Sequence, residues 1–577
     1  MGQKNSLWVL FLVLLGVILY WNSLRTPFIW DEDFLILGDL RVHNASLGDE
    51  IFGKSFLPSS EGFSRFYRPL ITLSLRTDYL LWKKNPFGYH LTNLLLHLFN
   101  TLLVYGLLLR ILKKPPLAFL GAFLFLAHPA HVEAVTYIPG RVDLIPFFFV
   151  LASFHLYLLG RSGRKFWPYL LSVFCYGGAL LSKEMAAFFP AVILGHLLLV
   201  ERKKEKLRLA EGVLLLGMFF VFLGWAFFRQ LVSVQIPLKT LLDIPRLPIR
   251  LLTIPKLLFA YLKMWFFPWP THMEHMISYK ALSVYQLVLE WALLFLIVIW
   301  ILIRFRKPEE RFWFLWIFVM LLPVLQIFPI YLGSFQLFVS EHFLYFASVG
   351  MIMLLALRFG GFLVNEEGLL RENKGLLFFG TVLILFSSLV IWRNGEYRDR
   401  IVFFEQTVRF APWSSRAYNQ LGLAYKNAGY PEEAEAAFQK ALLIEPTKVA
   451  PYVNLGSIDY DHGRIEEAEA RYLIALKKMP RDSILLHNMG VLRNSQKRWR
   501  EAIPYFEQAL IGANWPANME TYVELSHAHW ELGEKEKALQ LVEEGLKKDP
   551  SHEHLLEVKA WIEEKLGKGV NGKFNNK

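Results

Sequence analysis

The chain has 577 residues, of which 54% are hydrophobic and 19% charged, and its formal net charge is +12. This much apolar surface excludes a chain that is disordered throughout, and its grouping into long runs excludes a single soluble globule. One cysteine, Cys175, excludes an intramolecular disulfide, a thiolate zinc site and an iron–sulfur centre. The excess of Lys and Arg is interpreted as a signal that orients the chain across a bilayer, not as a nucleic-acid surface.

Runs long enough to cross a bilayer, about 20 apolar residues each, recur from the N-terminus to Trp392. We predict about eleven spans, near residues 7–24, 90–110, 117–135, 143–160, 166–182, 186–200, 209–228, 281–303, 312–332, 343–360 and 375–392. The shorter, proline-flanked segment 255–270 is predicted to be re-entrant or interfacial. No small-residue cleavage site follows the first run, so we expect an uncleaved anchor.

Basic residues gather in alternate connections, for example Lys113-Lys114, 202–208 and 304–311. The positive-inside rule places these connections and the N-terminus in the cytoplasm. An odd number of spans then places the C-terminal region on the periplasmic, extracellular or luminal side. A bacterial or archaeal cell membrane is favoured over an endoplasmic reticulum.

A period of 34 residues appears after the last apolar run. Its positions match the tetratricopeptide pattern over four units, in which each repeat is a pair of helices that stacks on the next. The predicted fold is therefore all-α, with a polytopic bundle at 1–392, repeats at 393–566 and a polar tail at 567–577. Residues 396–412 are interpreted as half a repeat. In the first three units the recurring residues include Leu421, Gly422, Ala434 and Phe438; Leu455, Gly456, Ala468 and Tyr472; and Met489, Gly490, Ala502 and Phe506.

The predicted outer side carries the polar groups. The first outer loop, 25–89, begins with Asp31-Glu32-Asp33 directly after the first span, and other polar groups flank later spans. Ionisable groups at membrane depth are functional candidates. A divalent metal is possible at the histidine cluster but is not favoured, because no full ligand set is visible. The further polar candidates are His90, His128, His131, Glu133, Asp143, Glu184 and Glu341.

Six motifs together resemble the transmembrane and tetratricopeptide repeat-containing family, which belongs with protein O-mannosyltransferases in the GT-C glycosyltransferase superfamily. They are Trp30-Asp31-Glu32, Tyr67-Arg68-Pro69-Leu70, Asn85-Pro86-Phe87-Gly88-Tyr89-His90, His128-Pro129-Ala130-His131-Val132-Glu133-Ala134, Gly140-Arg141-Val142-Asp143-Leu144 and Ser182-Lys183-Glu184.

This resemblance implies a donor with one sugar, often mannose, on a polyprenyl phosphate. It also implies a catalytic acidic pair, here Asp31 and Glu32. Two features depart from the family pattern: Asp33 adds a third acid, and His342 stands where relatives commonly have an Arg.

The residue types suit this chemistry. A carboxylate such as Asp31 can take the proton of an attacking Ser or Thr hydroxyl. The leaving phosphate needs cations, for which the candidates are Arg68, Arg141, Lys183 and His342.

The repeats are expected to bind a protein or peptide acceptor. Gln420, Asn454 and Asn488 recur at one phase, and their amides would hydrogen-bond an extended backbone. The same amides would equally well bridge neighbouring repeats. Two other functions stay open at this stage: a lipid-linked oligosaccharide ligase or polymerase, and a non-enzymatic repeat scaffold anchored in the membrane.

Overall fold

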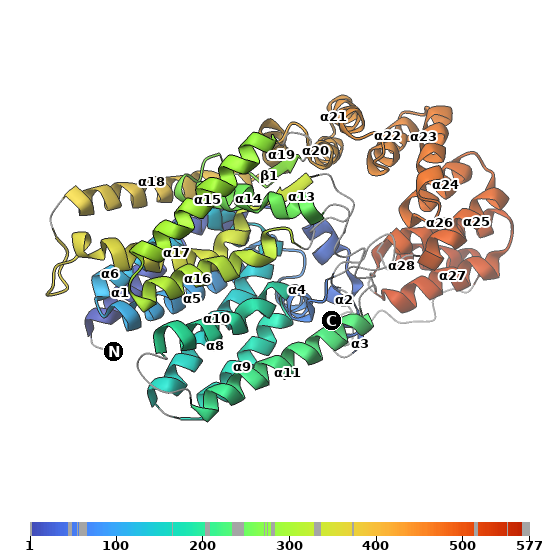
Figure 1. Cartoon of the computed structure of the whole chain (residues 1–577). Coiled ribbons are helices and arrows are strands. Elements are labelled where there is room, and N and C mark those ends of the chain that lie inside the picture. Colours follow the sequence, from blue (N-terminus) through green and yellow to red (C-terminus); the bar gives the residue numbers. More distant parts are fainter. Residues whose placement is uncertain are drawn as a thin grey trace. The chain divides into compact units, whose positions relative to one another are not determined.

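The computed structural model describes residues 3–43, 49–54, 56, 66–163, 165–201, 208–232, 247–270, 272–273, 275–278, 283–327, 336–371, 374–512, 517–550 and 552–567. The chain divides into two compact units, one of residues 1–32 and 66–412, the other of residues 33–65 and 413–577. Helices dominate both (Figure 1). The predicted all-α fold, a membrane bundle followed by helical repeats, is confirmed.

The described part of the first unit is a bundle of helices of very different lengths. Several helices begin with proline, whose fixed φ suits the first helical position and whose missing N–H is not needed there. The α-helices are α1 (Gln3–Tyr20), α4 (Pro69–Trp82), α5 (Pro86–Leu112), α6 (Pro115–Leu126), α7 (Val132–Thr136), α8 (Arg141–Gly163), α9 (Trp167–Leu180), α10 (Phe189–His196), α11 (Leu209–Val232), α13 (Leu247–Leu252), α14 (Ile254–Phe266), α15 (Val284–Arg304), α16 (Pro308–Leu321), α17 (Leu344–Leu363), α18 (Lys374–Glu396) and α19 (Arg400–Phe410).

Short 3-10 and π segments connect them. They are η1 (Trp21–Arg25), η3 (Pro129–His131), η4 (Ile138–Gly140), η5 (Glu184–Phe188), η6 (Leu197–Glu201), η9 (Leu322–Val324) and η10 (Glu341–Phe343).

Eight helices within the described residues are long and apolar enough to cross a membrane, or nine if the bent pair 115–126 and 129–136 is one span. The sequence predicted about eleven. The two that fail are α9 and α16, which have 14 residues each. At 1.5 Å per residue such a helix is about 21 Å long, shorter than a hydrocarbon core of about 30 Å. Part of the predicted span 312–332 lies outside the described residues.

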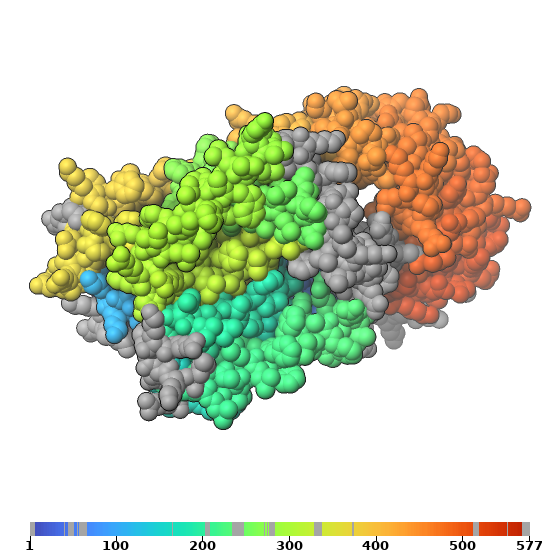
Figure 2. Space-filling view, viewed as in Figure 1, coloured from blue at the N-terminus to red at the C-terminus, as the bar shows by residue number. Residues whose placement is uncertain are grey.

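The chain is a multi-pass membrane protein. Helix α15 lies on the surface of the first unit (Figure 2), and its apolar side chains are exposed there, for example Val288 at 64% and Leu289 at 68%. A contiguous apolar face of this kind suits lipid and not water. Polar groups inside the bundle instead pair between helices: His97 lies 2.7 Å from the Tyr345 hydroxyl, and Asn100 donates to the Leu144 carbonyl at 3.0 Å.

A small two-stranded sheet precedes one part of the site. Strand β1 (His275–Ser278) pairs antiparallel with β2 (Gln336–Val339), and His275 lies opposite Val339. Helices α15 and α16 lie between the two strands in the sequence. Residues 340–342 leave the sheet directly after β2 and enter η10. This register brings the backbone around His272 and His275 to the carboxylate of Glu341.

The second unit contains the repeats, as four helix pairs and one further helix. The pairs are α20 (Ser415–Asn427) with α21 (Pro431–Ile444), α22 (Ala450–Asp461) with α23 (Ile465–Lys478), α24 (Ser483–Ser495) with α25 (Trp499–Gly512), and α26 (Ala517–Glu531) with α27 (Lys535–Lys548); α28 (Glu553–Lys565) follows. The described part of segment 33–65 adds η2 (Asp33–Leu37), α2 (Leu40–His43) and α3 (Asp49–Phe52).

The repeat glycines allow each helix pair to pack closely. A Cβ on Gly422 would lie 2.5 Å from the Phe438 ring, and one on Gly456 would lie 2.5 Å from the Tyr472 ring. Only a residue without a side chain fits at these approaches. The 34-residue period thus pairs a glycine on the first helix with an aromatic ring on the second.

Helix α19 groups with the first unit, although the sequence suggested half a repeat there. Its Phe403 and Phe404 rings lie 6.4 and 5.2 Å from the Trp30 ring, both in edge-on orientation. The helix thereby supports the loop that carries the acidic pair.

Candidate functional site

The acidic pair follows η1, and its two carboxylates differ in environment. Glu32 is 1% exposed, and its Oε2 accepts the backbone N–H of Trp30 at 2.8 Å. Asp31 is only partly buried, and its backbone N–H donates to the Tyr137 hydroxyl at 3.2 Å. The Tyr137 hydroxyl also hydrogen-bonds the Asp31 side chain. Asp31 is therefore the more accessible of the two acids.

Tyr137 occupies the turn between α7 and η4. The side-chain amide of Asn93 on α5 holds this turn by donating to the carbonyls of Val135, Tyr137 and Ile138 at 3.1–3.2 Å. Burial, and next the negative charges of Asp31 and Glu32, raise the pKa of the Tyr137 phenol well above its ordinary value. Tyr137 therefore remains a protonated donor beside the acids.

Arg68 forms an ion pair with Glu184 across 116 residues of sequence. Its Nη2 lies 2.6 Å from Oε1, and its Nε donates to Oε2 at 3.1 Å, the side-on fork typical of arginine with a carboxylate. The Arg68 guanidinium also lies 4.3 Å above the Phe66 ring centre. The pair joins the start of α4 to the start of η5.

A second polar cluster joins three further segments. The Lys183 ammonium lies 2.5 Å from Oδ1 of Asp143, and His342 Nε2 lies 3.9 Å from Oδ2 of the same carboxylate. His342 Nδ1 lies 2.8 Å from Oε1 of Glu133, and the Ser340 hydroxyl donates to both oxygens of Glu133 at 2.8–2.9 Å. The histidine thus bridges two buried carboxylates.

Arg141 and His90 have bonds that fix the scaffold around the site. Arg141 is fully buried; its Nη1 lies 2.8 Å from Asp78 and its Nη2 donates to the Tyr89 carbonyl at 3.2 Å. His90 Nε2 lies 2.7 Å from the Thr26 hydroxyl, which ties α5 to the chain just before the acidic pair.

The two histidines of the 128–134 motif make hydrogen bonds within the protein. His128 Nε2 lies 3.0 Å from the Trp265 carbonyl, and its Nδ1 accepts the Ala130 N–H at 3.2 Å. His131 bonds the Phe125 carbonyl at 2.8 Å and the Ser348 hydroxyl at 2.9 Å. Both ring nitrogens of each are used. Within the residues that the structure describes, no group of three His, Cys, Asp or Glu side chains is arranged to hold a metal.

Glu341, at the start of η10, accepts the His272 N–H at 3.0 Å through Oε1 and lies 3.4 Å from His275 Nε2. It is 2% exposed. The pairing of β1 with β2 provides this arrangement.

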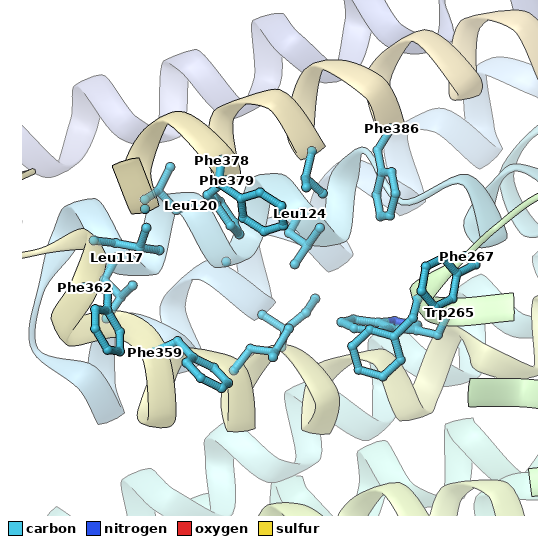
Figure 3. A pocket seen from close by; sticks show the side chains of 18 residues that line it. Leu117, Leu120, Leu124, Trp265, Phe267, Phe359, Phe362, Phe378, Phe379 and Phe386 are labelled. Atoms are coloured by element: carbon cyan, nitrogen blue, oxygen red, sulfur yellow. The ribbon is translucent and has the colours of Figure 1, made fainter. Parts of the chain in front are cut away.

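An apolar cavity of ≈ 560 Å³ lies among α6, α14, α17 and α18. Figure 3 shows leucines of α6 and phenylalanines of α17 and α18 directed into it, with Trp265 and Phe386 at one end. The rings of Trp265 and Phe386 each lie 5.1 Å from the His128 ring, so this end of the cavity adjoins the histidine motif.

The remaining candidates belong to the second unit. Asp33 begins η2. Gln420, Asn454 and Asn488 lie half-buried on the first helices of successive repeats, α20, α22 and α24. The Asn454 amide donates to Asn419 of the preceding repeat at 2.9 Å, which is the bridging role.

Segment 133–143 contacts three of the other candidate residues of the first unit. Glu133 contacts His342, Tyr137 contacts Asp31, and Asp143 contacts Lys183. Sequence reasoning missed Tyr137 and Ser340, and also Arg393 and Tyr397 at the end of the last span. A tyrosine or serine beside a span has no distinctive spacing, and an Arg at a span end looks like a flanking charge.

Comparison with known proteins agrees with the motifs. Residues 49–253 match the family model described as dolichyl-phosphate-mannose-protein mannosyltransferase, and residues 415–448, 453–518 and 494–562 match tetratricopeptide repeat models. The resemblance inferred from the motifs is therefore confirmed: the chain is similar to protein O-mannosyltransferases and contains tetratricopeptide repeats.

Three similar proteins define the extent of the match. Human protein O-mannosyl-transferase TMTC3 is 23% identical over 85% of this chain and 59% of its own length, and Drosophila melanogaster Tmtc3 is 24% identical over 88% and 64%. The chain thus spans less than two thirds of these relatives. The solved Pseudomonas aeruginosa pilF structure is 24% identical over 27% of this chain and 69% of that chain, with a TM-score of 0.26. The human and Drosophila relatives are animal proteins. The location of this chain in a bacterial or archaeal membrane stays a prediction.

Proposed function

We propose that this chain is a membrane glycosyltransferase that moves one sugar, mannose by family resemblance, from a polyprenyl phosphate to a hydroxyl of a protein or peptide. The observation that carries the proposal is segment 133–143. It holds an accessible carboxylate, Asp31, through Tyr137, and through Glu133 and Asp143 it contacts the His342 ring and the Lys183 ammonium. A base and nearby cations are what this transfer requires.

Asp31 is the proposed base. The acceptor oxygen attacks the anomeric carbon and gives its proton to the Asp31 carboxylate, while the bond from that carbon to the phosphate oxygen breaks. The electron pair leaves with the polyprenyl phosphate. Glu32 is a positioning residue in this scheme, because its carboxylate is buried against the Trp30 N–H and fixes the loop.

Arg68 and Lys183 are the proposed partners of the departing phosphate, with His342 as a further donor. Each lies in an ion pair, and the guanidinium carries five N–H donors and the ammonium three. Arg141 is fully buried against Asp78 and is proposed to act by holding α8 to α4.

The cavity of ≈ 560 Å³ is the proposed place for part of the isoprenoid chain, because its walls are apolar and one end adjoins His128. Ala356 lines it, so Ala356→Phe should reduce the space and weaken donor binding by about tenfold or more, an estimate from the burial of several methylene groups. The matched control is Leu385→Phe, which adds a ring at an outward-facing position of α18 that is 55% exposed. Equal effects of the two substitutions on donor affinity would reject this placement.

The repeats are proposed to bind the acceptor on the side of the membrane where the acids lie. Gln420 and Asn488 are the stronger candidates for peptide contacts, because Asn454 already bridges two repeats. Their replacement by alanine should raise KM for a protein acceptor and leave release of sugar to water unchanged.

The deciding experiment is a transfer assay with purified full-length protein in detergent, polyprenyl-phosphate mannose and candidate acceptors. Wild type should transfer or release mannose, and Asp31→Asn should lower the rate by about 10³-fold or more, since the loss of a general base and of a charge both act. A melting temperature like that of wild type would show that the variant is folded. Undiminished rates in Asp31→Asn and Glu32→Gln would refute the proposed mechanism.

A further inference from the structure

A second group of buried charges lies where α18 ends, apart from the cations already assigned to the phosphate. Arg393 is 2% exposed, Glu396 5%, Tyr397 0% and Glu341 2%. Arg393 Nη1 forms an ion pair with Oε2 of Glu396, and its guanidinium lies 5.4 Å above the Tyr397 ring centre. The charge of Arg393 also acts on Glu341 and Glu133, so the group adjoins the site.

Five polar atoms of this group have no hydrogen-bond partner in the described part of the chain. They are Nε and Nη2 of Arg393, Oε1 of Glu396, Oε2 of Glu341 and the hydroxyl of Tyr397. Buried polar atoms are normally paired, and leaving one without a partner costs about 1–3 kcal/mol each. So many in one place indicate that something outside the chain completes them.

The identity of these atoms restricts what the ligand is. Nε and Nη2 form one edge of the guanidinium and present two parallel donors. The two carboxylate oxygens are acceptors, and the tyrosine hydroxyl does either. An anion would satisfy the donors but not the carboxylates, and one guanidinium against two carboxylates leaves the group with a net negative charge. A cation would satisfy the carboxylates but not the guanidinium.

A neutral group with several adjacent hydroxyls satisfies both kinds of atom, as water molecules also would, since each hydroxyl donates one hydrogen bond and accepts others. A single serine or threonine hydroxyl of an acceptor has one oxygen, too few for five protein atoms on four side chains. A hexose presents vicinal hydroxyls around its ring.

We propose that Arg393, Glu341, Glu396 and Tyr397 bind the hydroxyls of the transferred sugar. The inference rests on the proposed function, and it assigns the sugar and the phosphate of the donor to different residues. The phosphate is assigned to Arg68 and Lys183, and the sugar ring to the Arg393 group. The four members of that group are thereby binding residues that the motifs of the first half do not include.

The test compares two carriers, polyprenyl phosphate and polyprenyl-phosphate mannose, bound to the purified full-length protein in detergent. The main variant is Tyr397→Phe, because the hydroxyl it removes has no partner within the described residues and its loss costs the fold little. Wild type should bind the sugar-bearing carrier more tightly. Tyr397→Phe should reduce that preference about fivefold to tenfold, the value of one hydrogen bond, and leave affinity for the bare carrier unchanged.

Two further variants sharpen the result. Arg393→Lys keeps the charge but loses the edge of two nitrogens, so the preference should fall further, while bare-carrier binding persists. Tyr176→Phe is the matched control, since Tyr176 on α9 is also fully buried and its hydroxyl also has no partner in the described structure; it should change neither affinity.

Equal binding of both carriers by wild type, or an unchanged preference in Tyr397→Phe and Arg393→Lys, would overturn the sugar site while leaving the lipid-phosphate donor intact. Failure of wild type to bind either carrier would overturn the donor class itself and this inference with it.

Discussion

Replacement of Tyr137 by phenylalanine tests how the acidic pair is held. The substitution keeps the ring and removes only the hydroxyl, which accepts the Asp31 N–H at 3.2 Å and bonds the Asp31 side chain. Asn93 would still fix the turn, because it binds backbone carbonyls. The expected defect is therefore in the placement of the base and not in the fold.

The magnitude follows from the bonds lost. A hydrogen bond to a charged group contributes about 1.5–3 kcal/mol, and the bond to the Asp31 N–H adds about 1 kcal/mol. If their full value is expressed in the transition state and not in the bound ground state, kcat should fall about 70- to 900-fold, with donor KM changing by less than about threefold. Asp31→Asn should fall further, because it removes the base itself.

The assay is mannose transfer by purified protein at varied donor concentration, with the melting temperature measured on the same samples. Tyr105→Phe is the control, since Tyr105 is 1% exposed and its hydroxyl has no partner among the described residues. Wild-type kcat in Tyr137→Phe would refute the assignment, and so would a loss of activity matched by a loss of folded protein.

Two more substitutions probe other parts of the chain. Arg68→Lys keeps a positive charge but loses the two-nitrogen fork on Glu184, so kcat/KM should fall about 10- to 100-fold; wild-type kcat/KM would remove Arg68 from the phosphate contacts. Gly456→Ala places a Cβ 2.5 Å from the Tyr472 ring, and such overpacking should destabilise the repeats by about 1–3 kcal/mol, seen as a lower midpoint in thermal unfolding followed by circular dichroism. Gly380→Ala, at a position on α18 with open space around it, should leave that midpoint unchanged.

The sequence predicts the architecture well where a period is long and regular. The 34-residue period places Gly456 against Tyr472, and the structure has that contact. The sequence predicts the number of membrane spans less well, because hydropathy alone does not reveal where a helix ends. Helices α9 and α16 stop after 14 residues, since apolar residues continue through turns that a window of hydropathy does not detect.

Site residues are predictable as a set but not as pairs. Motif positions identify Arg68 and Glu184, yet nothing in either motif indicates that they form an ion pair, because pairing depends on which helix ends are neighbours. The spacing of His128 and His131 permits a metal, which the sequence did not favour. In the structure, both ring nitrogens of each histidine are bonded within the protein.

The pairing of the cations bears on how a charged donor would enter. An unpaired ammonium buried at Lys183 would cost several kcal/mol in the empty protein, so Asp143 stabilises it there. An ammonium has three N–H donors, and Asp143 accepts from one face of it. A phosphate can therefore approach Lys183 without displacing Asp143, and the carboxylate limits the net positive charge that remains after the phosphate leaves. If this is correct, Asp143→Asn should bind the bare polyprenyl phosphate more tightly than wild type and release it more slowly, so that turnover falls while product affinity rises. Weaker binding of the bare carrier by a folded Asp143→Asn protein would show instead that Asp143 serves to orient Lys183, because loss of that orientation lowers affinity.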